Sequence, residues 1–129
     1  VPRHLRKEFS KMLGIEIESA DEREAVVRME VPDGLMSPFG TVHGGAIATL
    51  LDTALAVAIS RRLDGPDRIA THNLNVSYIS FARERGLVCH TRVVSLRHAV
   101  AVAEGEVLTA GGTLVAKALG TFGVRRHAA

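Results

Sequence analysis

The stretch that decides the fold is HGGAIATLLDTALAVAISRRL, residues 43–63. It is rich in Ala and Leu, which favour helix, and Arg61 and Arg62 stand in its last turn, where cations suit the helix dipole. Because the stretch is apolar on nearly every side, we expect other structure to wrap around it. The stretch therefore predicts one long helix at the centre of the domain.

Strand-like segments lie on both sides of this helix. Residues 3–13 have the apolar spacing of a short amphipathic helix, and residues 15–19 and 23–31 have the pattern of strands. A loop with two Pro and two Gly then leads into the long helix. Long strands with short connections follow the helix, which indicates an α+β domain whose antiparallel sheet curls around it. The expected downstream strands are 68–80, 86–96, 98–109 and 113–124.

Composition excludes several classes of function. The 129 residues suit one domain, and 47% hydrophobic with 23% charged residues is ordinary for a globular protein. A net charge of +2, four Phe, one Tyr and no Trp favour neither nucleic-acid binding nor base stacking. The longest apolar stretch, 46–59, is too short to span a membrane, and no signal peptide is visible. The single Cys89 excludes a disulfide framework, so we expect a cytoplasmic protein without membrane or nucleic-acid partners.

The start of the long helix carries the first candidate chemistry. His43, Gly44 and Gly45 form its first turn, where backbone N–H groups lack helical partners and carry partial positive charge. Such a turn suits an oxyanion or a polarised carbonyl, and two glycines let a ligand approach the backbone closely. The alternative is structural, since Gly-Gly also marks a tight connection from loop to helix.

Asp52 is the second candidate. It stands among apolar residues on a helix expected to be largely buried, where an isolated carboxylate is costly. A structural Asp would bond a backbone amide or a neighbouring hydroxyl, such as that of Thr49 or Thr53. A functional Asp would act as a nucleophile or general base in a cleft.

Helix geometry separates these two candidates. Nine residues of α-helix place His43 and Asp52 about 13–14 Å apart along the axis and on opposite faces. One chain therefore cannot bring both to one bond, and a shared substrate requires a second subunit. The helix face that carries Asp52 has small and polar side chains, so another subunit could pack closely against it. Its residues are Gly45, Thr49, Asp52, Ala56 and Ser60.

On these residues the chain resembles the hotdog-fold acyl-CoA thioesterases, especially the phenylacetate-degradation type of the 4-hydroxybenzoyl-CoA thioesterase superfamily. The resemblance runs over roughly residues 7–124 and is carried by GTVHGGAIATLLDTALAVA at 40–58 and THNLNVSYISFA at 71–82. It implies a hotdog fold, in which an antiparallel sheet wraps around one long central helix. It also implies hydrolysis of an acyl-CoA thioester to free acid and CoA.

The resemblance implies a role for each matching residue. His43 would contact or orient the thioester, and the Gly44 N–H would polarise its carbonyl. Asp52 from the opposite subunit would attack the carbonyl or activate water. Thr71 falls where the family has a Ser or Thr that positions the carboxylate or the water. The reaction would use no metal and no cofactor, with coenzyme A as part of the substrate.

Some positions depart from the family pattern or conflict with simple geometry. Ser37 stands where many relatives carry Asn, so it could hold a water or the thioester only with a different reach. Phe81 stands where Pro is usual. Strict strand alternation puts Thr71 on the face opposite Leu74, so Thr71 joins the site only through a bulge or from the end of the strand.

Basic residues are candidates for the nucleotide phosphates of CoA. In similar enzymes, basic residues at about these positions meet the phosphates. The candidates in this chain are Arg83 and Arg85, which follow a predicted strand, and Arg97 and His98 at the next hairpin. Arg suits bidentate phosphate contacts, although exposed Arg at turns is also commonplace. Gly45 is expected to contact the substrate, beside Gly44.

The sequence thus predicts a homodimer whose sheets join edge to edge, with two equivalent sites at the seam, and a homotetramer formed by pairing of dimers. The alternatives are a non-catalytic acyl-CoA-binding hotdog protein, a hotdog enoyl-CoA hydratase and a non-enzymatic assembly protein. The identity of the acyl group stays open.

Overall fold

The computed structural model describes residues 8–63 and 68–125. The long helix and every predicted strand are present within a few residues of their expected bounds. Of the expected helix at 3–13, residues 3–7 lie outside the described residues. In chain order the elements are α2 (Glu8–Met12), β1 (Ile15–Ala20), β2 (Glu24–Glu30), the 3₁₀ turn η1 (Asp33–Leu35), α3 (Gly44–Ser60), β3 (Arg68–Tyr78), β4 (Gly86–Arg97), β5 (Val100–Thr109) and β6 (Leu114–Arg125).

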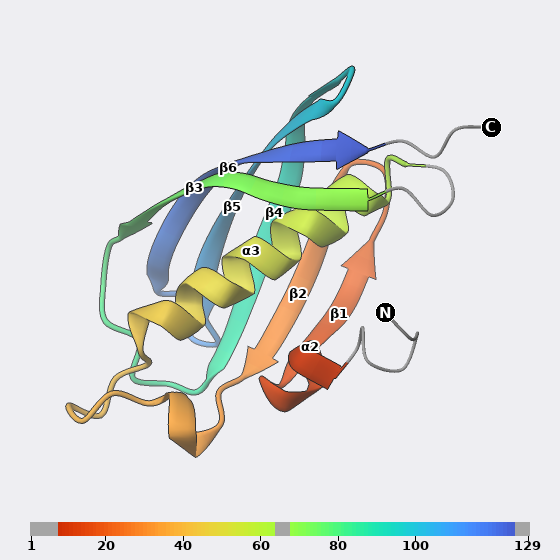
Figure 1. The fold of residues 1–129 in the computed structure, drawn as a ribbon. Helices are drawn as coiled ribbons and strands as arrows, with labels where there is room; N and C mark the ends of the chain where they lie inside the picture. Colours follow the sequence, from red (N-terminus) through yellow and green to blue (C-terminus); the bar gives the residue numbers. More distant parts are fainter. Residues whose placement is uncertain (1–7, 64–67, 126–129) are drawn as a thin grey trace.

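The strands form one antiparallel sheet of six strands in the order β1-β2-β4-β5-β6-β3. Figure 1 shows this sheet curled around α3, with the two edge strands β3 and β1 on either side of the helix. The predicted α+β architecture, a hotdog fold with an antiparallel sheet wrapped around a long helix, is confirmed.

The core lies between α3 and the concave face of the sheet. Buried side chains recur on α3 at helical spacing, and Leu50, Leu51, Leu55 and Ile59 are completely buried. Strand β5 alternates buried and partly buried residues, as expected for a strand with one face on the core. Each completely buried Leu or Ile side chain contributes about 1.5–3 kcal/mol to folding, so this packing holds α3 firmly against the sheet.

One face of α3 stays uncovered within the chain, although its apolar sequence predicts a helix wrapped on all sides. Gly45 and Ser60 are exposed, and Thr49, Asp52 and Ala56 are only half-buried. This is the small, polar face that the sequence marks as a seam between subunits.

Candidate active site

His43 caps the N-terminus of α3. Its backbone is extended (φ −61°, ψ 135°), and its Nδ1 accepts a hydrogen bond of 2.9 Å from the Gly45 N–H. Because Nδ1 is the acceptor, the proton of the neutral imidazole lies on Nε2. Within the described residues Nε2 has no hydrogen-bond partner. The His43 ring therefore presents a free N–H donor beside the helix start.

Gly44 is the first residue of α3, and its N–H finds no acceptor among the residues that the structure describes. Its carbonyl oxygen accepts a hydrogen bond of 2.7 Å from the Tyr78 hydroxyl. A Cβ on Gly44 would lie 3.4 Å from the Tyr78 ring, so the ring packs against this glycine. Tyr78 was not among the predicted site residues, although it lies in the quoted THNLNVSYISFA segment.

A cleft of about 730 Å³ opens at this helix start. Its walls are the loop before α3, the first turn of α3, and the end of β3 with the residues that follow. Phe39 and Phe81 are 88% and 80% exposed at its rim, and Tyr78 also lines it. The chain has only five aromatic residues (four Phe and one Tyr), so three of them at one cleft indicate an apolar ligand group. We call this space the entrance cleft.

Ser37 lies in the wall of the entrance cleft, together with His43, Gly44 and Gly45. Its hydroxyl is 2.9 Å from the Thr41 hydroxyl and accepts a 3.2 Å hydrogen bond from the Phe39 N–H. The Ser37 hydroxyl therefore shapes the loop that carries Phe39.

Asp52 and Thr71 meet in a second hollow, of about 350 Å³, which we call the carboxylate hollow. The Thr71 hydroxyl donates a hydrogen bond of 2.6 Å to Asp52 Oδ1. Thr49, which the sequence offered as a structural partner of this carboxylate, instead donates to the Gly45 carbonyl at 2.8 Å. Asp52 is thus open to a hollow on the uncovered face and held by a residue of β3.

A bulge turns Thr71 toward Asp52. Thr71 pairs with Phe122 and Asn73 pairs with Thr121, so His72 is an extra residue in β3. The His72 ring lies over Gly123, where a Cβ would come within 2.5 Å of it. The sequence left a bulge and the strand end as routes for Thr71, and the structure shows the bulge.

Within one chain, His43 and Asp52 face different spaces. A third hollow of about 330 Å³, the bridging hollow, lies between them and shares Phe9 and Thr49 with the carboxylate hollow. It also shares His43 and Gly45 with the entrance cleft. The three spaces therefore follow one another along the uncovered face of α3, and a single chain does not bring His43 and Asp52 together.

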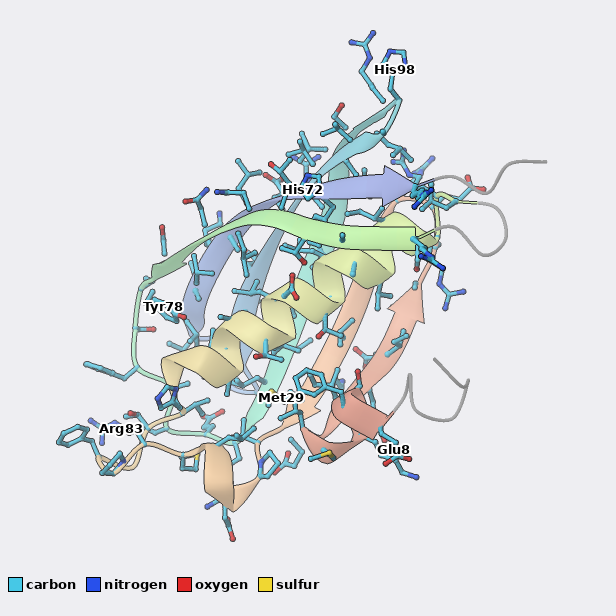
Figure 2. All side chains as sticks on the ribbon, in the orientation of Figure 1. Glu8, Met29, His72, Tyr78, Arg83 and His98 are labelled. Atoms are coloured by element: carbon cyan, nitrogen blue, oxygen red, sulfur yellow. The ribbon has the colours of Figure 1, made fainter. Side chains whose placement is uncertain are left out.

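The predicted phosphate-binding residues divide into two groups. Arg83 and Arg85 are exposed in the connection from β3 to β4. Arg85 forms an ion pair with Asp33, whereas Arg83 forms none within the described ranges. Arg97 ends β4 and His98 follows it; Figure 2 shows His98 at the opposite end of the molecule from Tyr78 and Arg83.

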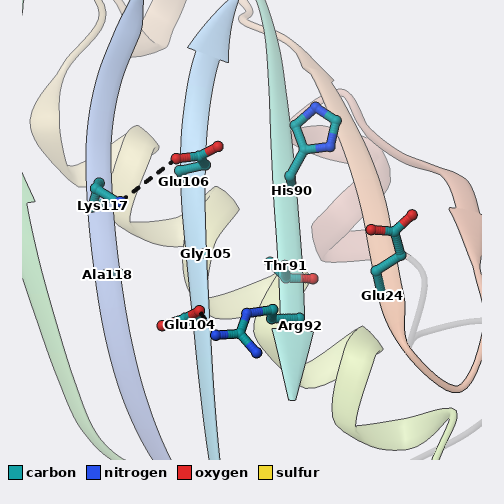
Figure 3. A pocket seen from close by; sticks show the side chains of 9 residues that line it. All are labelled: Glu24, His90, Thr91, Arg92, Glu104, Gly105, Glu106, Lys117 and Ala118. Carbon is teal, nitrogen blue, oxygen red and sulfur yellow. Dashed lines mark ion pairs between the residues drawn. The ribbon is translucent and has the colours of Figure 1, made fainter. Parts of the chain in front are cut away.

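Another hollow, of about 260 Å³, lies on the outer face of the sheet and contains none of the predicted site residues. Figure 3 shows its charged side chains on neighbouring strands. Lys117 pairs with Glu106 at 3.8 Å and Arg92 with Glu104 at 2.5 Å. Glu24 is a third carboxylate in the lining, so two ion pairs and one further carboxylate face this hollow.

Other sequence expectations concern groups away from the clefts. Burial raises the pKa of the Cys89 thiol to about 12, so this core thiol stays protonated near neutral pH. The described residues contain no cluster of three His, Cys, Asp or Glu side chains that could hold a metal ion. No helix in the described part of the chain has the length and apolarity needed to cross a membrane.

Comparison with known proteins identifies the family. A family model described as the thioesterase superfamily matches residues 39–116, more than half of the chain. The relative VNG_1336C of Halobacterium salinarum is 38% identical over 106 residues, covering 78% of this chain and 70% of that protein. Its name describes it as an esterase, provisionally. The 1,4-dihydroxy-2-naphthoyl-CoA hydrolase of Listeria monocytogenes is 29% identical over 83 residues, covering 64% of this chain and 67% of that enzyme.

A solved structure supports the same assignment. The conserved protein PA5202 of Pseudomonas aeruginosa superposes with a TM-score of 0.86 and 27% identity, covering 95% of this chain and 99% of that one. Together with the open helix start and the Asp52–Thr71 pair, these similarities show that the chain belongs to the thioesterase superfamily and is a thioester hydrolase with the hotdog fold.

Proposed function

We propose that the protein hydrolyses an acyl-CoA thioester to the free acid and CoA, in a site shared by two subunits. The observation that carries this proposal is the division of the polar groups on the uncovered face of α3. The unpaired N–H of Gly44 opens into the entrance cleft, whereas the Thr71-bound carboxylate of Asp52 opens into the carboxylate hollow. A second copy of the chain would supply the missing half of each site.

The chemistry follows from these groups. The Gly44 N–H and the positive end of the helix dipole would stabilise negative charge on the thioester oxygen, and the His43 Nε2–H would donate beside it. Asp52 of the partner subunit would attack the carbonyl carbon, or take a proton from the water that attacks it. If Asp52 attacks, the C–S bond breaks to leave an acyl–Asp52 anhydride, and water then hydrolyses this anhydride to the free acid. If Asp52 instead takes a proton from water, the water oxygen forms the new C–O bond and the C–S bond breaks. In both routes the CoA thiolate takes up the proton that water loses and leaves as the thiol, and Asp52 returns to a carboxylate. No metal or cofactor is part of this scheme.

The proposed dimer forms by antiparallel pairing of β3 with its copy. Strand β3 is eleven residues long and mostly exposed, and among the described strands it pairs with β6 alone, so one side of it is an open edge. Tyr78 touches Gly44 and Thr71 touches Asp52 in the same chain. Bringing Asp52 of the partner subunit to Gly44 therefore places the partner's Thr71 opposite Tyr78.

This requirement defines the register of the pairing. His72 is the extra residue of the bulge, so the ladder runs from Thr71 to Asn73 and onward to Tyr78. Asn75 is the middle position of that ladder. The two-fold axis of the proposed dimer therefore passes beside Asn75, which would face Asn75 of the partner subunit.

The surrounding hollows suggest where the substrate lies. The bridging hollow is lined by Phe9, Leu13 and Leu35 and touches His43, so it suits an apolar acyl group. Of Arg83 and Arg85, Arg83 is the better candidate for a CoA phosphate, because Arg85 is paired with Asp33 and Arg83 has no ion-pair partner within the described residues. His98 lies at the opposite end of the molecule from Tyr78, and Arg97 precedes it at the end of β4, so both would contribute only from the partner subunit.

The finer assignments belong to the same proposal. Within the superfamily we favour the phenylacetate-degradation type, because the acid stands nine residues after His43 and is bonded to Thr71. Pairing of dimers into a tetramer remains a prediction. A cytoplasmic location is supported by the single buried free thiol of Cys89.

Release of free thiol from a panel of aryl, short-chain and medium-chain acyl-CoAs tests the proposal. We expect Asp52→Asn to lower kcat by at least about a hundredfold, the lower range for loss of a general base or nucleophile. Glu106→Gln, which removes a carboxylate from the outer face of the sheet, should leave the rate unchanged. Equal release by wild type and Asp52→Asn would remove Asp52 from the mechanism. Tight binding of acyl-CoA without release from any substrate would favour the non-catalytic binding protein.

A further inference from the structure

A continuous chain of hydrogen bonds links Tyr78 to His43. The Tyr78 hydroxyl donates to the Gly44 carbonyl oxygen at 2.7 Å, and the Gly45 N–H donates to His43 Nδ1 at 2.9 Å. The Gly44 carbonyl and the Gly45 N–H belong to the same peptide group. Tyr78 and His43 are thus connected through a single polarisable peptide.

A peptide group transmits polarisation from its oxygen to its N–H. A hydrogen bond donated to the oxygen shifts electron density away from the nitrogen, which makes the N–H a stronger donor. That donor meets His43 Nδ1 and favours the neutral tautomer that carries its proton on Nε2. The phenol of Tyr78 therefore reinforces the tautomer and orientation of the His43 ring without touching the ring.

We propose that Tyr78 is a positioning residue that acts through the Gly44–Gly45 peptide to hold His43 as a hydrogen-bond donor at the entrance cleft. The proposal rests on the proposed thioesterase function and adds a role for a side chain outside the predicted site. It also assigns the direction of the His43 bond, because Nδ1 is occupied as an acceptor and Nε2–H remains for the substrate.

Close packing at both glycines supports this arrangement. A Cβ on Gly45 would lie 3.1 Å from His43 Nδ1, closer than most such contacts, so alanine at this position would push the imidazole aside. A Cβ on Gly44 would lie 3.4 Å from the Tyr78 ring. The two glycines thus let an imidazole and a phenol lie against the same peptide from its two ends.

The arrangement assigns different roles to His43 and Asp52 in the proposed reaction. A His43 ring fixed in this way donates a proton toward the thioester and has no lone pair free in the cleft to accept one. The group that accepts a proton from water, or attacks the carbonyl, must then be the carboxylate of Asp52.

The direct test is ¹⁵N NMR of the imidazole nitrogens at about pH 8.5, where imidazoles are neutral. His43→Gln assigns the His43 signals among the six histidines of the chain. We expect the His43 Nδ1 of the wild type to be unprotonated and Nε2 to be protonated. A wild-type spectrum with the proton on Nδ1 would overturn the proposal without any further variant.

Tyr78→Phe keeps the ring and removes the hydroxyl, and Thr91→Val is the matched control. The Thr91 hydroxyl also bonds a backbone carbonyl, that of Ala25, and it lines none of the three spaces along the uncovered face of α3. We expect Tyr78→Phe to increase the Nδ1-protonated tautomer and to lower kcat about three- to tenfold with KM nearly unchanged, as loss of one neutral hydrogen bond implies. Thr91→Val should change neither quantity.

The possible results separate the two proposals. An unchanged tautomer and an unchanged kcat in Tyr78→Phe would contradict the positioning role of Tyr78. A wild-type protein that hydrolyses no acyl-CoA would contradict the proposed function, while the NMR spectra would still decide the state of His43. A fall in melting temperature alone, with the tautomer intact, would make Tyr78 a structural residue and also overturn the proposal.

Discussion

The carboxylate of Asp52 is held at Oδ1 by the Thr71 hydroxyl at 2.6 Å, and it opens into a hollow on the uncovered face of α3. The structural alternative gives this carboxylate a backbone amide or a neighbouring hydroxyl as its partner, such as that of Thr49 or Thr53. Asp52 instead receives its hydrogen bond from the bulged segment of a neighbouring strand. At the residue scale, the bond between Thr71 and Asp52 is the contact that orients the proposed base or nucleophile.

Thr71→Val tests that contact, because valine has nearly the same shape and lacks the hydroxyl. A hydrogen bond to a charged group is worth about 1.5–3 kcal/mol, so we expect kcat to fall about ten- to a hundredfold with little change in KM. Steady-state thiol release measures both constants. Thr71→Ser keeps the hydroxyl and should restore most of the rate. Equal rates for the valine and serine variants would show that the hydroxyl does not orient Asp52.

At the element scale, the short connection between α2 and β1 controls how α2 is placed. Gly14 has φ 70°, in the left-handed region, and its carbonyl accepts a hydrogen bond of 3.0 Å from the Glu30 N–H. This connection anchors α2, which carries Phe9 into the bridging and carboxylate hollows.

Gly14→Ala should destabilise the protein by about 1–3 kcal/mol, from the strained backbone and a steric clash. A Cβ at this position would lie 2.3 Å from the Glu30 carbonyl oxygen, which belongs to rigid backbone. The matched control is Gly34→Ala, since a Cβ there meets nothing within 4 Å. Thermal unfolding should show a melting temperature several degrees lower for Gly14→Ala than for Gly34→Ala. Equal melting temperatures would contradict this explanation of Gly14.

The regular elements could be predicted from the sequence because local patterns determine them. The run from Gly44 to Ser60 is rich in Ala and Leu and contains no Pro, and the strands alternate between clear turn signals. The helix begins one residue later than predicted, because His43 has an extended backbone and caps the helix. The order of the strands in the sheet was not predicted, since it depends on contacts between segments far apart in the chain.

The candidate site could be predicted only in part. His43, Gly44 and Asp52 stood out because their residue types are unusual for the start or middle of an apolar helix. The inward turn of Thr71 depends on the bulge at His72, and strict alternation misses such an extra residue. Tyr78 was missed because its hydrogen bond to Gly44 spans 34 positions of the chain.

At the scale of the whole molecule, the open edge of β3 and the uncovered face of α3 lie next to one another (Figure 1). In the proposed dimer both features meet the second subunit, and the proposed register brings both into one seam. Asn75, at the middle of β3, is exposed and should face its copy across the two-fold axis.

Cross-linking tests this register. Residues directly opposite in an antiparallel pair have Cβ atoms about 4.5–5.5 Å apart, near the reach of a disulfide. Asn75→Cys should therefore form a disulfide-linked dimer under mild oxidation, visible on a non-reducing gel. Asn73→Cys lies on the same face, but its copy would be about 13 Å away and should not cross-link. The buried Cys89 should not interfere. Preferred cross-linking at Asn73 would contradict the proposed register.

Gly44→Pro removes the proposed oxyanion donor with little change to the helix. Proline is favoured at the first position of a helix, where it replaces an N–H that has no helical partner. It also requires an extended preceding residue, and His43 already has ψ 135°. We expect this variant to fold and to lose most of its hydrolytic activity, as Asp52→Asn should.

Mixed dimers of Gly44→Pro and Asp52→Asn test the shared site most directly. Each heterodimer would hold one doubly damaged site and one intact site, made from the Gly44 of one chain and the Asp52 of the other. With random mixing after co-refolding, about a quarter of all sites would be intact, so thiol release should recover to about a quarter of the wild-type rate. If mass spectrometry shows heterodimers and the mixture stays as inactive as its two parents, the donors and the carboxylate do not come from different subunits.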